Sequence, residues 1–71
     1  MSRYLIIIEK TESGFSAYSP DIAGCVATGR TRDETEASMR DAIAFHLDGM
    51  REEGLPVPQP SSVAAYVEIA A

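Results

Sequence analysis

The sequence predicts an α+β fold of the order βββαβ, an antiparallel sheet with one long helix packed on one face. Two observations lead to this class. Short β-branched segments separated by turn residues fill the first thirty positions, and a helix-capping signal opens a long amphipathic stretch after them. Because the chain has 71 residues, it has room for one hydrophobic core and is expected to form a single domain over residues 1–71.

Three strands are predicted in the first thirty residues. Residues 3–10 are rich in β-branched side chains and end at a Thr-Glu-Ser-Gly turn. Residues 15–19 alternate until Pro20, which lacks the N–H that a sheet ladder needs. Residues 25–28 form the third strand, which Gly29 closes. Consecutive short strands with tight turns predict an antiparallel meander.

A long helix follows the strands. Thr31 and Glu34 form a Thr-x-x-Glu capping box, which places the first helical residue directly after Thr31. The helix is expected to run to about Glu53, because Gly54 can adopt the left-handed conformation and Pro56 cannot continue a helix. After a proline-rich crossing over residues 57–60, the apolar residues 62–69 predict a last strand.

The predicted helix has an apolar face and an acidic face. At about 100° per residue, one side carries the residues expected in the core: Thr35, Met39, Ala42, Ile43, His46, Leu47 and Met50. The opposite side carries a stripe of acids: Glu34, Asp41, Asp48 and Glu52. Acids near a helix C-terminus oppose the macrodipole, so this stripe favours a basic partner, and a merely solvated face remains the alternative. Phe45 flanks the stripe and has the character of a contact residue.

The sheet has more apolar surface than one helix can cover. Leu5 and Ile7 point away from the face that Tyr4, Ile6 and Ile8 share. Gly49 costs stability in mid-helix, which indicates close approach by another backbone. We therefore expect Leu5, Ile7 and Gly49 to contribute to self-association, as a dimer or a tetramer.

Few residues offer catalytic chemistry. His46 is the only histidine and Cys25 the only cysteine. Both are expected to pack in the protein rather than to act as a nucleophile or a metal ligand. Capping and turn roles account for Asp21, Asp33 and Glu34 without a metal. No catalytic residue, cofactor or metal is expected, and a Cys25–His46 dyad stays open.

The net charge and the hydropathy of the chain argue against nucleic acids and membranes as binding partners. Eleven acidic and six basic residues give a net charge of −5, which disfavours direct nucleic-acid binding because phosphates require a positive face. The longest apolar run, over residues 4–8, is too short for a signal peptide or a membrane span. A cytoplasmic protein that binds no membrane is expected.

Several motifs in a fixed order resemble one known family. They are YSPDIAGCVATG over residues 18–29, AIAFHLDGM over residues 42–50 and GLPVP over residues 54–58. In this combination the sequence resembles the HicB antitoxins, with departures at Ala23, Arg30 and Thr35. The resemblance implies a degenerate RNase H-like fold that lacks the nuclease carboxylates, and a non-catalytic protein that binds and masks a small basic mRNA-cleaving toxin of the HicA type.

The resemblance also implies a role for the acidic stripe in binding the toxin. Glu34, Asp41, Phe45, Asp48 and Glu52 are the residues we expect to contact the toxin. Many relatives carry a C-terminal DNA-binding domain, and this sequence shows none, so promoter binding by this chain is not expected. The alternatives are a stand-alone homo-oligomeric domain without a toxin partner, and a small-ligand-binding or residual hydrolase domain of RNase H-like fold.

Overall fold

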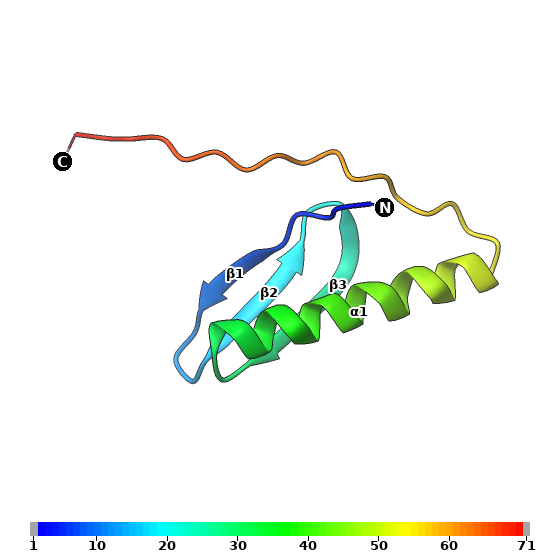
Figure 1. The fold of residues 1–71 in the computed structure, drawn as a ribbon, viewed down its shortest axis with the longest axis horizontal. Helices are drawn as coiled ribbons and strands as arrows, with labels where there is room; N and C mark the ends of the chain where they lie inside the picture. Colours follow the sequence, from blue (N-terminus) through cyan, green and yellow to red (C-terminus); the bar gives the residue numbers. More distant parts are fainter. Residues whose placement is uncertain (1, 71) are drawn as a thin grey trace.

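The computed structural model describes residues 2–70 as a three-stranded sheet with one helix across it. The sheet contains β1 (Ile7–Lys10), β2 (Phe15–Ser19) and β3 (Ile22–Gly29), antiparallel in the order β1-β2-β3. The helix α1 (Arg32–Glu52) lies over one face of the sheet, as Figure 1 shows. The predicted α+β class and the antiparallel meander with its long helix are confirmed.

Both ends of α1 have the caps that the sequence predicts. The Thr31 side chain accepts a hydrogen bond from the Glu34 amide at 3.1 Å, and the Glu34 carboxylate accepts one from the Thr31 amide at 3.2 Å. At the other end Gly54 has φ of 72°, and the amide of Leu55 donates to the Met50 carbonyl at 2.9 Å. These bonds satisfy backbone groups that a helix end otherwise leaves without partners.

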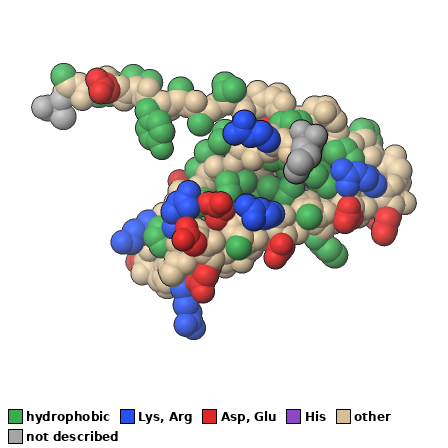
Figure 2. All heavy atoms as spheres, viewed as in Figure 1, with side chains coloured by type: hydrophobic (Ala, Val, Ile, Leu, Met, Phe, Trp, Pro, Cys, Tyr) green, Lys and Arg blue, Asp and Glu red, His purple; other side chains and the backbone are tan. Residues whose placement is uncertain are grey.

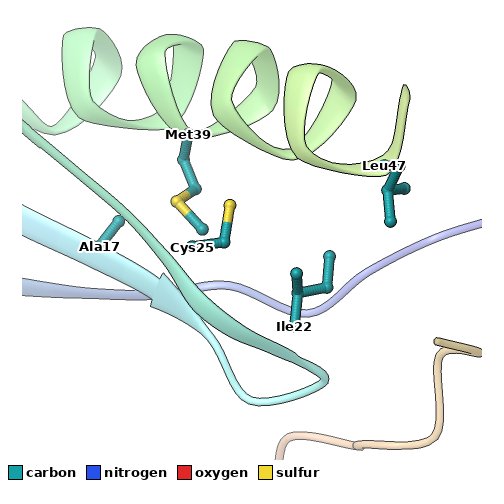
Figure 3. Packing of buried hydrophobic residues seen from close by; sticks show 5 residues of the cluster. All are labelled: Ala17, Ile22, Cys25, Met39 and Leu47. Carbon is teal, nitrogen blue, oxygen red and sulfur yellow. The ribbon is translucent and has the colours of Figure 1, made fainter. Parts of the chain in front are cut away.

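The core lies between α1 and the sheet. Met39 and Leu47 point from the helix toward the strands, and Ile22 and Cys25 point back at them, as Figure 3 shows. Met39 is completely buried. The helix approaches closely where β3 ends, since a Cβ at Gly29 would lie 2.6 Å from the Thr35 hydroxyl.

The strand boundaries differ from the predicted ones at two places. β1 begins at Ile7 rather than at residue 3, because pairing with β2 starts at the Ile7–Tyr18 pair. β3 begins at Ile22, three residues before the predicted start, and a register irregularity between Tyr18 and Ser19 accommodates the tight turn. β2 has the predicted bounds.

The last predicted strand, residues 62–69, does not form in the single chain. Within the described residues, no strand follows α1, and the segment runs extended away from the body (Figure 1). A strand requires a neighbouring edge, and this segment pairs with none of the three strands. We call residues 63–70 the C-terminal arm.

Candidate functional site

The outer side of α1 carries the acidic stripe predicted from the sequence. The structure leaves every member of the predicted contact set exposed to solvent: Glu34, Asp41, Phe45, Asp48 and Glu52. Figure 2 shows acidic side chains spaced along the border of this helix. One regular helix positions them, because residues at these spacings return to the same side.

The acidic side chains of the stripe differ in the contacts that they make within the chain. Glu34 belongs to the capping box, so its carboxylate has a structural role. Asp48 pairs with Arg51 at 3.1 Å, in an ion pair that is largely exposed. Among residues 2–70, Asp41 and Glu52 take part in no ion pair. Asp41 and Glu52 are therefore the acids that a basic partner could engage without breaking an internal contact.

Phe45 is the most conspicuous apolar residue of α1. Its side chain is 83% exposed, between Asp41 and Asp48 in the sequence and on the same outer side. The core face of the same helix is filled by other residues, so packing within the chain does not require an aromatic here. An exposed aromatic beside charged groups has the composition of an interface anchor.

The residues predicted for self-association lie at two separate places. Leu5 and Ile7 sit half-buried on the face of the sheet that α1 does not cover, beside Tyr18, which is 43% exposed. Gly49 lies on α1, across the sheet from them, and a Cβ there would meet nothing within 4 Å. The chain itself therefore does not explain this glycine, and its role in self-association stays a prediction.

Asp21 was expected to have only a turn role, and the structure adds a long-range one. Its carboxylate accepts hydrogen bonds from the backbone amides and hydroxyls of Ser61 and Ser62, at 2.8 to 3.2 Å. The Ser62 hydroxyl, then the other donors, hold the pKa of Asp21 below its ordinary value. We call these four hydrogen bonds the Asp21 clasp. Because the two serines lie about forty residues from Asp21 in the sequence, no local pattern could predict it.

Cys25 and His46, the two residues weighed for chemistry, take different positions. Cys25 is buried in the core, and burial raises the pKa of its thiol, as for a packed hydrophobe. His46 lies half-buried on α1. The part of the chain that is described holds no group of three or more His, Cys, Asp or Glu side chains arranged to bind a metal ion. Within it, α1 is too polar to cross a membrane.

Comparison with known proteins assigns the family. Residues 4–70 match the family model described as "HicB_like antitoxin of bacterial toxin-antitoxin system". The chain belongs to the HicB-like antitoxin family. The resemblance seen in the sequence motifs is thereby confirmed.

Relatives of this family have similar sequences. The chain is 34% identical over 70 residues to "Antitoxin HicB 2" of Photorhabdus laumondii, covering 97% of this chain and 50% of that protein. It is also 34% identical to a protein of Haemophilus phage HP1, covering 90% and 48%, and to a UPF0150 protein of Helicobacter pylori, covering 90% of each. The chain thus spans about half the length of two of these relatives.

Solved structures show the same fold. A chain of the "HicA3 and HicB3 toxin-antitoxin complex" superposes with a TM-score of 0.73 and 38% identity, over 83% of this chain and 70% of that one. The "Antitoxin HicB3 crystal structure" gives a TM-score of 0.68 and 40% identity, over 80% and 42%. Membership of an antitoxin family favours a binding role over an enzymatic one.

Proposed function

We propose that this chain is a non-catalytic antitoxin that binds a small basic toxin of the HicA type and masks its RNA-binding surface. The observation that carries the proposal is the similarity, at 38% identity, to a chain of a HicA3–HicB3 complex. The net charge of −5 supports it, because the complementary charge of an mRNA-cleaving toxin is positive. No chemistry by this chain is needed for masking.

The outer side of α1 is the part of the surface we assign to the toxin. Asp41 and Glu52 present carboxylates without internal ion pairs in the described chain, and Asp48 adds a third acid between them. Carboxylates at these spacings stand where RNA phosphates would otherwise meet the toxin. Phe45 supplies the apolar contact that the charged groups surround.

Charge and apolar contact should affect different rate constants. Exposed acids attract a basic partner over a Debye length of about 10 Å at 0.1 M salt, so they act mainly on association. A buried aromatic anchor acts mainly on dissociation. Asp41 and Asp48 are therefore expected to set the association rate, and Phe45 the lifetime of the complex.

The test measures binding of the purified chain to a purified toxin of the HicA type. The variant Asp41→Lys with Asp48→Lys should lower the association rate about tenfold at low salt and less at high salt. Phe45→Ala should raise the dissociation rate by about 30-fold, as for an interface anchor.

The matched control reverses two exposed acids of the β1–β2 hairpin, Glu9→Lys with Glu12→Lys, which changes the net charge equally. Association slowed as strongly by this control would show that net charge alone acts, and would refute the assignment to α1. A chain that does not bind the toxin at all would instead support a stand-alone homo-oligomeric domain.

A further inference from the structure

Gly49 is the one glycine that the folded chain does not require. Of the five glycines, Gly24 and Gly54 have left-handed φ values of 76° and 72°, which other residues rarely adopt. Gly14 and Gly29 lie against neighbouring backbone, where a Cβ would clash. At Gly49 a Cβ would meet nothing within 4 Å. Neither conformation nor packing within the chain therefore calls for a glycine at this position.

The backbone at Gly49 is that of a regular helix. Its carbonyl accepts a hydrogen bond from the Glu53 amide at 3.1 Å, and its φ lies outside the left-handed region. In this conformation alanine is more stable than glycine, because glycine loses more backbone freedom when the chain folds. The chain thus has a residue that weakens α1 at a place where alanine would fit.

Gly49 lies on the outer side of α1, one turn after Phe45. Four residues correspond to about 40° around the helix axis and about 6 Å along it. The Phe45 side chain is 83% exposed, and Glu52, about 60° from Gly49 on the next turn, is exposed as well. Gly49 is therefore a gap in the side-chain surface of α1, between a projecting aromatic ring and an acid.

A gap of this kind suits the main chain of a partner. Packed helices lie about 8 to 10 Å apart, depending on the side chains at the contact, and a glycine permits the short end of this range. An element that crosses α1 at Gly49 would also contact the ring of Phe45 from one side. The gap therefore favours a partner that approaches with its backbone.

Charge decides between two occupants of the gap. Asp48 and Glu52 border it with exposed carboxylates, and the whole chain has a net charge of −5. A second copy brought against this side of α1 would place like charges together, whereas a basic protein would meet opposite ones. The occupant with the complementary charge is the basic toxin.

We propose that the main chain of the toxin crosses α1 at Gly49, and that this residue sets how closely the two proteins approach. The inference rests on the proposed binding of a basic HicA-type toxin and adds the point of closest contact. Gly49 acts by leaving space. A methyl group there would hold the toxin away from α1, and a separation of about 0.5 to 1 Å already loses a quarter to a half of the van der Waals attraction.

Gly49→Ala should therefore change stability and binding in opposite directions. The midpoint of thermal unfolding, measured by circular dichroism at constant chain concentration, should rise by about 2 to 8 °C. In surface plasmon resonance with a purified toxin of the HicA type, the dissociation constant should rise about tenfold. Gly49→Leu, which has a similar helix propensity and a larger side chain, should raise the dissociation constant at least ~100-fold.

The rate constants distinguish this steric effect from an electrostatic one. Gly49→Ala should act on the dissociation rate, and its effect should be the same at low and at high salt, because no charge changes. The charge reversals at Asp41 and Asp48 should instead act on association and depend on salt. An effect of Gly49→Ala confined to association would contradict a close contact at this residue.

Ala44→Gly is the matched control. Ala44 is exposed on the same helix, about 140° around the axis from Gly49. This variant should lower the unfolding midpoint by about 2 to 8 °C and leave the affinity for the toxin unchanged. The double variant Ala44→Gly with Gly49→Ala should have nearly the native midpoint and still bind the toxin about tenfold more weakly, which separates binding from stability.

The outcomes separate this inference from the function on which it rests. If the native chain binds the toxin and Gly49→Ala and Gly49→Leu bind it equally well, the crossing at Gly49 is refuted and the proposed function stands. A native chain that does not bind the toxin would refute both. Sedimentation of the chain without toxin should be unchanged by Gly49→Ala; an altered oligomeric state with native toxin affinity would assign Gly49 to self-association and overturn the proposal.

Discussion

Replacing Met39 by alanine should remove a large part of the stability of this domain. Met39 is completely buried at the centre of the cluster between α1 and the sheet, against the region of Ala17 and Cys25 (Figure 3). Loss of a buried methionine side chain costs about 2 to 5 kcal/mol, since transfer and cavity terms add. A domain of this length has roughly 4 to 10 kcal/mol in total.

Unfolding by urea and by heat, each monitored by the circular dichroism of the helix, measures the loss of stability. Each kcal/mol corresponds to about 4 to 8 °C in a domain of this size, so the midpoint of thermal unfolding should fall by at least ~8 °C. Chain concentration must be held constant, because self-association couples to stability. Phe45→Ala is the matched control on the same helix, and its effect should stay within about 0.5 kcal/mol.

Two outcomes would contradict the expected effect of Met39→Ala. If Met39→Ala cost less than about 1 kcal/mol, the packing of α1 on the sheet would not be the source of stability. If Phe45→Ala cost as much as Met39→Ala, the outer side of α1 would be packed in solution. The second outcome would also argue that Phe45 belongs to a self-association surface rather than to a toxin contact.

Two further predictions concern titrating groups. Because the folded-state pKa of Asp21 is lowered, its contribution to stability is present above the ordinary value of 3.8 and is lost as pH falls through the lowered folded-state value. The difference in urea midpoint between the native chain and Asp21→Asn should therefore be clear at pH 7 and shrink as the pH falls below 3.8 and through the lowered folded-state pKa. An equal difference at neutral and at acid pH would contradict the clasp. Burial and the raised pKa of Cys25 predict that its thiol reacts with Ellman's reagent at least ~100-fold more slowly in the folded chain than in urea, and equal rates would show that it is accessible.

Local signals predicted the helix well. The Thr31–Glu34 capping box and the left-handed Gly54 act within four residues of the helix ends, so the sequence contains the whole of each motif. The alternation that sets β2 is equally local. Such features need no knowledge of what lies elsewhere in the chain.

Features that depend on distant partners could not be predicted in this way. The apolar residues 62–69 have strand composition, but composition does not supply an edge to pair with. The Asp21 clasp joins residues forty positions apart, and β1 shortens because pairing with β2 decides where a strand begins. In contrast, the acidic stripe followed from helical spacing, and the capping role of Glu34 within it followed from the local motif with Thr31.

A groove of about 360 Å³ between the first strand and α1 lies on a different side of α1 from the surface assigned to the toxin. Arg40 and Ile43 line this groove, whereas Asp41, Phe45 and Asp48 lie about 100° or more around the helix from Ile43. A toxin bound to the outer side of α1 therefore leaves the groove uncovered. Loss of toxin binding by Phe45→Ala should accordingly leave the oligomeric state of the chain without toxin unchanged, and a change in sedimentation would show that Phe45 lies in a self-association surface.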